Sequence, residues 1–173
     1  MLKRGAFFIH HSSFIIYHSL IFGLVFALLT PPFQSPDEPN HFFRAWQISE
    51  GHFFPETSGN RLGGMLPHSL TQVCDSFHYL KNNQQARLST RTWSSTFDIP
   101  LQPENRRFTD FANTAIYAPT AYLPQATAIA VLRPLGATPL QMLYGIRIAN
   151  LLVWITLVSA ALRRMPFARS TLA

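Results

Sequence analysis

Asp37 and Glu38 are the residues of this sequence whose type and spacing best suit acid–base chemistry. They lie side by side between Pro36 and Pro39, shortly after a long apolar run that ends at Thr30. A carboxylate held within hydrogen-bond reach of a hydroxyl group can take its proton, which contributes roughly 10²–10⁴-fold to a rate. The two prolines restrict the backbone around the acids. The functional interpretation of the pattern is general-base or metal-linked chemistry, with a divalent cation as the cofactor in the second case, at the outer face of a membrane.

The same acids also fit a structural role at the start of a helix. Acidic residues at a helix N-terminus complement the helix dipole, and some accept hydrogen bonds from its free N–H groups. Ser35 and Glu38 have the spacing of a capping box. Because Glu38 precedes a proline, the helix is expected to begin at Pro39, which leaves side-chain capping to Asp37. The residues alone leave the catalytic and the capping interpretations open.

The composition indicates a membrane protein. The chain is 47% hydrophobic and 13% charged, and this charged share is about half of that in soluble domains. The formal net charge is +6. All eight acids and half of the basic residues lie within residues 31–113, and the other bases flank or interrupt apolar segments. No basic patch with aromatic residues is visible, so nucleic-acid binding is not expected. Cys74 is the only cysteine, which excludes an internal disulfide.

Two apolar segments are expected to cross the membrane, because their lengths approach a ~30 Å hydrocarbon core. Basic residues before the first segment and after the second predict that both ends are cytoplasmic, which requires an even number of crossings. Three crossings, or a cleaved signal peptide followed by a secreted domain, are the alternatives. The predicted order is a cytoplasmic N-terminus (1–11), a transmembrane helix (12–30), an extracytoplasmic loop (31–113), a broken segment (114–136), a transmembrane helix (139–162) and a basic cytoplasmic tail (163–173).

Two further segments are expected to lie at the membrane interface. A helix from Pro39 to Ser49 carries a broad aromatic face next to the membrane exit. The segment 114–136 is interrupted by prolines and is too short to cross unaided, so it lies at the interface or is re-entrant. Residues 82–107 show no clear period. The predicted fold class is mainly α and integral to the membrane, with two transmembrane helices flanking a large extracytoplasmic loop with interfacial helices.

Several polar residues are weaker candidates for substrate binding. An arginine inside an apolar segment is by default a functional candidate, although a position near the helix end also allows its charge to reach the interface. Tyrosines on a broken helix either anchor it at the interface or contact a substrate. His41 is expected to be solvated or packed, and Arg44 to contact lipid headgroups. The substrate-binding candidates are Arg44, Tyr117, Tyr122, Gln125 and Arg147.

Four ordered stretches resemble a family of bacterial predicted membrane proteins, the domain-of-unknown-function family 2142. The resemblance extends from residue 22 to residue 160. The stretches are "TPPFQSPDEPNHFFRAWQISEG", "GGMLPHSL", "FANTAIYAPTAYLPQATAI" and "LYGIRIANLL".

That family in turn resembles polytopic glycosyltransferases that take sugars from polyprenyl-phosphate carriers. The resemblance implies an inner-membrane protein that transfers a sugar to an envelope glycan or lipid, with Asp37 as the general base and Glu38 as a supporting or metal-linked acid. Family members are expected to be much longer, so this chain is interpreted as an N-terminal part that is inactive alone. The alternative is a non-catalytic scaffold or partner protein of the cell envelope, in which the acids start a helix.

Overall fold

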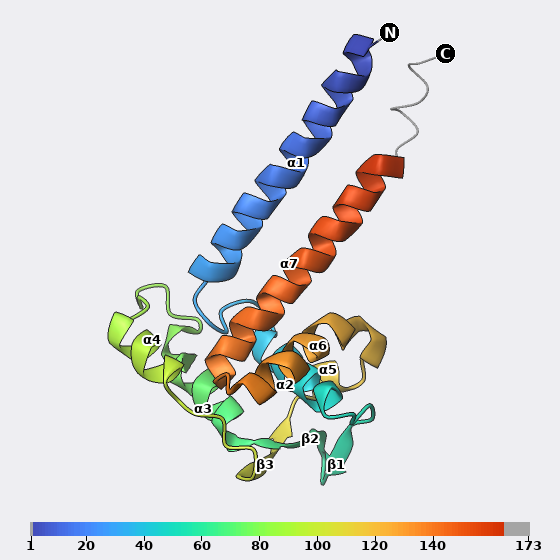
Figure 1. Cartoon of the computed structure of the whole chain (residues 1–173). Coiled ribbons are helices and arrows are strands. Elements are labelled where there is room, and N and C mark those ends of the chain that lie inside the picture. The colour runs from blue at the N-terminus through green and yellow to red at the C-terminus, as the bar shows by residue number, and fades with distance from the viewer. Residues whose placement is uncertain (1, 165–173) are drawn as a thin grey trace.

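Residues 31–138 fold at one end of two long helices that lie side by side (Figure 1). The computed structural model describes the backbone of residues 2–164 and the side chains of residues 13–164. In chain order the elements are α1 (Leu2–Leu29), α2 (Glu38–Ser49), β1 (Glu56–Ser58), β2 (Arg61–Pro67), α3 (His68–Ser76), the 3₁₀ helix η1 (His78–Leu80), α4 (Thr90–Phe97), β3 (Arg106–Asp110), α5 (Ala112–Ala115), η2 (Pro119–Tyr122), α6 (Leu123–Leu132), η3 (Arg133–Leu135) and α7 (Pro139–Arg164).

Helices α1 and α7 run antiparallel and contact each other, so the start of α1 and the end of α7 lie at the same end of the molecule (Figure 1). Gly23 permits their close approach. A Cβ atom at this position would lie 2.3 Å from Cδ1 of Leu151, which is too close for any larger residue without a shift of that side chain. The first two turns of α7 are buried against the folded domain, whereas many of the apolar side chains described on α1 and on the second half of α7 are exposed.

Among the described residues, α7 is the one helix long and apolar enough to cross a membrane. This supports the span predicted at 139–162. The described apolar part of α1, Ser13–Leu29, is shorter, so its crossing stays a prediction. The helix begins at Leu2, and residues 2–11 therefore continue α1 instead of forming a separate terminus. Of the predicted basic tail, Arg163 and Arg164 end α7, and residues 165–173 lie outside the described residues.

Helix α2 forms where the sequence predicts it, but its position differs from the expectation. Its aromatic face is buried, and Phe42, Ala45 and Trp46 are fully enclosed. Helices α5 and α6 and strand β2 pack against it. The prediction of an interfacial helix was wrong for α2, because an apolar face next to a membrane exit is covered here by protein and not by lipid headgroups.

A three-stranded antiparallel sheet with the order β1-β2-β3 was not predicted. Strand β2 pairs with β3 in the register Gly63↔Asp110 to Pro67↔Arg106. A Cβ atom on Gly63 would lie 1.9 Å from the backbone oxygen of Thr109, so this strand contact requires a glycine. The stretch 82–107 contains α4 and the beginning of β3, although neither element produces a clear hydrophobic period.

The segment 114–136 is broken at its prolines, as predicted. Pro119 begins η2, Pro124 lies in the first turn of α6, and Pro134 lies in η3. Helix α6 buries Ala126 and Ile129 and packs against α2 and α7. The segment is therefore part of the same folded unit as α2, and its location at a membrane interface stays a prediction.

We expect Gly63→Ala to lower the free energy of unfolding by about 1–3 kcal/mol, because the added methyl group overpacks the β2–β3 contact. Met65→Ala is the matched control, since Met65 lies on the same strand with an exposed side chain, and we expect it to change stability by less than about 0.5 kcal/mol. Denaturant unfolding of the purified protein in detergent measures both. Equal effects of the two substitutions would contradict the assigned register.

Candidate functional site

The two neighbouring acids, Asp37 and Glu38, occupy different environments. Asp37 is exposed, whereas the Glu38 side chain is 13% exposed and faces α7. Neither acid caps α2 with its side chain. Asp37 is the N-cap residue, and the hydrogen bond that it accepts from the helix, donated by the His41 amide at 3.0 Å, goes to its backbone oxygen and not to its side chain. The capping-box spacing of Ser35 and Glu38 is likewise unused, because Ser35 lies in the preceding turn. The capping interpretation of the side chains was therefore wrong.

Glu38 forms a bidentate ion pair with Arg147 of α7. Arg147 donates from Nε to Glu38 Oε1 at 2.7 Å and from Nη2 to Glu38 Oε2 at 2.8 Å. Its other hydrogen bonds go to backbone oxygens of Ala27, Thr30 and Pro31, at 3.0, 2.8 and 3.2 Å. A guanidinium has five N–H donors, and these five bonds use all of them. Arg147 thus satisfies carbonyl groups that the C-terminus of a helix leaves without partners, and it has no donor left for a substrate.

The ion pair also fixes the connection between α1 and α2. Glu38 Oε2 accepts a further hydrogen bond from the Phe33 amide at 2.8 Å. Phe33 has a φ of 60°, which is a strained backbone conformation for a bulky residue. Its ring is buried and lies 5.9 Å from Phe42 and 6.2 Å from Phe77, measured between ring centroids. The packing of the ring and the bond to Glu38 together hold this conformation.

Asp37 is oriented differently because its own backbone is left-handed, with a φ of 57°. Aspartate tolerates this conformation better than most residues. Its Oδ1 accepts a hydrogen bond from Asn113 Nδ2 at 2.9 Å. Among the described residues, no hydrogen bond reaches Oδ2. One carboxylate oxygen is therefore positioned by the protein and the other is free to accept a proton or a hydrogen bond.

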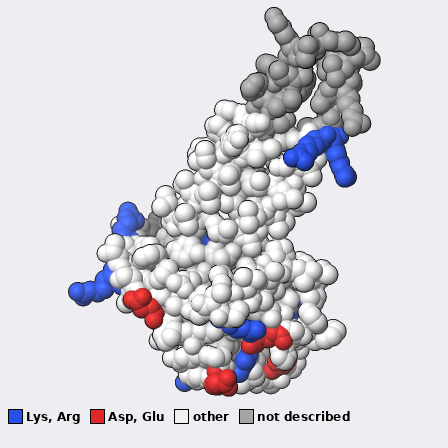
Figure 2. Space-filling model, in the orientation of Figure 1, with Lys and Arg blue, Asp and Glu red and all other residues white. Residues whose placement is uncertain are grey.

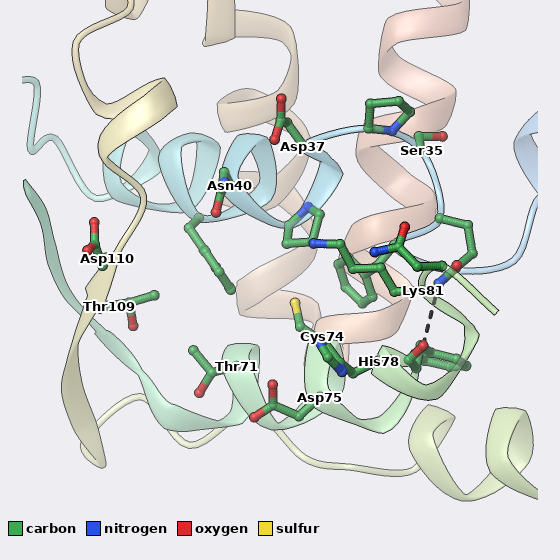
Figure 3. Close-up of a pocket in the computed structure, with 17 residues that line it drawn as sticks. Ser35, Asp37, Asn40, Thr71, Cys74, Asp75, His78, Lys81, Thr109 and Asp110 are labelled. Atoms are coloured by element: carbon green, nitrogen blue, oxygen red, sulfur yellow. Dashed lines mark hydrogen bonds between the residues drawn. The ribbon is translucent and has the colours of Figure 1, made fainter.

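Asp37 lies at the edge of a polar cavity of about 590 Å³ between α2, α3 and β3. Figure 3 shows Asp37 and Asn40 on the α2 side, Thr71 and Asp75 across from them, and Asp110 on β3. The volume falls within the roughly 300–1,000 Å³ range of small-molecule sites. The cavity therefore has the size of a binding site, and its lining combines polar side chains with apolar ones such as Phe33 and Phe43.

The charge of this cavity is negative. Three aspartates line it, and one lysine, Lys81, offsets part of their charge. The aspartates are Asp37, Asp75 and Asp110. Burial raises the pKa of the Cys74 thiol well above its ordinary value, and the charges of Asp75 and Glu38 raise it further. Cys74 is accordingly a neutral part of the wall. A negative cavity disfavours phosphate groups and suits hydroxyl groups or cations.

The described residues contain no group of three or more His, Cys, Asp or Glu side chains placed to bind a metal ion. The three aspartates of the cavity come from separate elements, the start of α2, α3 and the end of β3. The sequence pattern raised the hypothesis of a bound divalent cation. The part of the chain that the structure describes offers no cluster of three such side chains to bind it.

Arg44, Tyr117 and Tyr122 do come together, but on the other side of α2. Arg44 is fully buried and donates from Nη2 to the backbone oxygens of Phe53 and Tyr117, at 2.9 and 3.2 Å. Burial lowers the pKa of Arg44 and raises the pKa of Tyr122 to about 12. The expected contact of Arg44 with lipid headgroups was wrong, because its side chain lies inside the folded unit.

His41 is packed, one of the two outcomes expected for it. Its Nδ1 lies 2.8 Å from the Tyr122 hydroxyl. Gln125 is half-buried, and its Oε1 has no hydrogen-bond partner among the described residues. None of these residues lines the cavity next to Asp37. The substrate-binding roles predicted for them stay predictions.

Four residues of this region were not predicted from the sequence: Asp75, Lys81, Asp110 and Asn113. Asn113 belongs to the quoted stretch that begins at Phe111, but nothing in its neighbours predicts a contact with a residue 76 positions earlier. Asp75 lies within a helix and Asp110 is the last residue of a strand, and neither element was predicted. Only the observation that all eight acids lie within residues 31–113 pointed towards a shared acidic surface.

Comparison with known proteins identifies one match. A family model described as "Predicted membrane protein (DUF2142)" matches residues 20–173. No curated protein matches the chain, and no solved structure does.

We expect Arg147→Lys to lower the free energy of unfolding by about 1–3 kcal/mol, because a lysine keeps the charge but loses the bidentate geometry and several hydrogen bonds. Arg133→Lys is the control. Arg133 pairs with Glu50 at 3.5 Å and its side chain is 37% exposed, against 10% for Arg147, so we expect a change below about 0.5 kcal/mol. Unfolding in detergent measures both, and a neutral Arg147→Lys would contradict the structural role.

Proposed function

Because the chain belongs to the DUF2142 family of predicted membrane proteins, we propose that α1 and α7 cross a bilayer as an antiparallel pair and hold residues 31–138 at its outer face. We further propose that the intact protein transfers a sugar from a polyprenyl-phosphate donor to an envelope glycan or lipid, with Asp37 as the general base. The observation that carries this proposal is the position of Asp37, which has one free oxygen at the edge of a polar cavity beside the helix ends.

The two long helices have the properties of a membrane anchor. At about 1.5 Å per residue, the 28 residues of α1 and the 26 of α7 each exceed a ~30 Å hydrocarbon core. Figure 2 shows almost no charged side chain on the visible face of the described part of this helix pair, while Arg163 and Arg164 end α7. Basic residues at that end favour a cytoplasmic location, which supports the proposal that the folded domain lies outside.

The proposed reaction needs a base and a donor whose leaving group, polyprenyl phosphate, departs as an anion without being protonated. Asp37 takes the proton from the acceptor hydroxyl, and the hydroxyl oxygen forms a bond with the anomeric carbon of the sugar. The bond between that carbon and the phosphate oxygen breaks, and polyprenyl phosphate leaves with the electron pair. The acidic cavity supports this assignment, since its carboxylates suit the sugar and acceptor hydroxyl groups while the phosphate remains outside.

A second candidate function is a non-catalytic scaffold or partner of other envelope proteins. The specific observation in its favour is that Glu38, half of the acidic pair, is fully used in the ion pair with Arg147. In this alternative the bond from Asn113 to Asp37 only connects α5 to the start of α2.

We expect Asp37→Asn to reduce transfer by at least about 10²-fold, because the amide cannot accept the proton. The measurement is transfer of a radiolabelled sugar from a polyprenyl-phosphate donor to envelope acceptors by the intact protein in proteoliposomes. Asp98→Asn is the control, since Asp98 is exposed at the end of α4 and does not line the cavity. Full transfer by Asp37→Asn would show that the base assignment is wrong. Absence of transfer in the unmodified protein, together with a stably co-purifying envelope protein, would favour the scaffold function.

The membrane arrangement is tested by cysteine labelling in a Cys74→Ser background. We expect Ser94→Cys, on the exposed part of α4, to react with a membrane-impermeant maleimide in intact spheroplasts. Arg164→Cys, at the end of α7, should react only after permeabilisation, since the start of α1 and the end of α7 are both predicted to be cytoplasmic. Labelling of Arg164→Cys in intact spheroplasts would rule out two crossings with the domain outside.

A further inference from the structure

A second cavity, of about 520 Å³, lies where the long helices meet α4. We call it the α4 groove. Its walls are the last residues of α1 (Leu28 and Leu29), the first two turns of α7, and the segment that contains Leu88, Trp93 and Phe97. Figure 1 shows α4 beside the junction of α1 and the folded domain. The α4 groove is separate from the acidic cavity, with which it shares no lining residue.

The walls of the α4 groove are mainly apolar, and two of their polar side chains bond to each other. The indole N–H of Trp93 donates to the Tyr144 hydroxyl at 3.1 Å, and the rings of Trp93 and Phe97 lie 5.1 Å apart. Yet Leu29 is 74% exposed and Leu28 is 55% exposed. Removing apolar surface from water is favourable by roughly 25 cal/mol per Å², so an apolar ligand gains free energy by covering the α4 groove.

We propose that the α4 groove binds one hydrocarbon chain of a bilayer phospholipid. The inference rests on the proposed membrane position of α1 and α7, but not on sugar transfer. Leu28 and Leu29 continue the exposed apolar surface of α1, which also includes Val25 and Phe26. A lipid chain that lies along α1 therefore reaches the α4 groove without leaving an apolar surface.

The surroundings of the α4 groove identify the rest of the ligand. Trp93 and Tyr144 are aromatic residues with a polar end, the kind that is enriched at membrane–water boundaries. Arg87 and Arg91 belong to the same segment as Leu88 and Trp93 and are exposed, and Figure 2 shows basic side chains on the left side of the molecule, where α4 lies. Cationic side chains next to an apolar groove match a phosphate headgroup attached to an apolar chain.

The first test is photo-crosslinking of the full chain in phospholipid vesicles. The probe is a phosphatidylglycerol that carries a diazirine in the middle of one chain. We expect crosslinks to residues 88–97 and 141–144 in excess of those to residues 152–157, which lie on the exposed part of α7. Crosslinks to 152–157 without any to 88–97 would overturn the groove proposal and leave the membrane position intact. Crosslinks to neither region would show that the membrane position itself is wrong.

The second test measures retained lipid by native mass spectrometry of the protein in detergent. We expect one phospholipid per chain, and we expect Leu88→Trp, which fills the α4 groove, to lower its retention at least about fivefold. Leu157→Trp is the matched control on the exposed surface of α7 and should retain the lipid. Equal retention by the two variants would overturn the proposal. The proposal would also be overturned if the unmodified chain were a dimer and Leu88→Trp made it a monomer. A second copy of the chain, and not a lipid, would then cover the α4 groove. Should Leu88→Trp not fold, the crosslinking pattern decides.

Discussion

The ion pair between Glu38 and Arg147 connects three parts of the chain that otherwise have few polar contacts with one another. Arg147 lies on α7 and donates hydrogen bonds to backbone carbonyl groups at the end of α1. It also binds the carboxylate of Glu38, which is the first residue of α2. A cation at the C-terminus of a helix is favourable, and five satisfied donors offset the cost of a largely buried charge. Because Glu38 also binds the Phe33 amide, the strained connection between α1 and α2 depends on the same pair. The position of Asp37, one residue before Glu38, follows from it.

Because of this ion pair, Glu38 and Asp37 have different roles at the connection between α1 and α2. Glu38 faces α7 and stabilises the fold, whereas Asp37 is exposed and lies at the edge of the acidic cavity. The α4 groove begins at the same helix end, on surfaces formed by Leu28 and Leu29. A polar cavity and an apolar groove thus lie at the boundary between the long helices and the folded domain. Such an arrangement suits a protein that handles a molecule with a polar and an apolar part.

The sequence predicted the elements whose signals are local. The prolines at 119, 124 and 134 correctly predicted a broken segment, and the apolar run to Leu162 predicted the long final helix. The sheet was missed because β1 has three residues and β2 contains two adjacent glycines, which weaken any strand pattern. Helix α2 was placed at the membrane interface because burial against α6 and burial against lipid require the same apolar face. The partner of Arg147 lies 109 positions away, and no local pattern reveals it.

The most direct measurement of the central interaction is a double-mutant cycle on the purified protein in detergent. It compares the free energies of unfolding of Glu38→Gln, Arg147→Gln and the double variant. If the two residues act through their ion pair, the double variant is little less stable than either single variant, with a coupling of about 1–3 kcal/mol. Strictly additive losses would show that the residues act independently, and would contradict a structure in which one ion pair joins α1, α2 and α7.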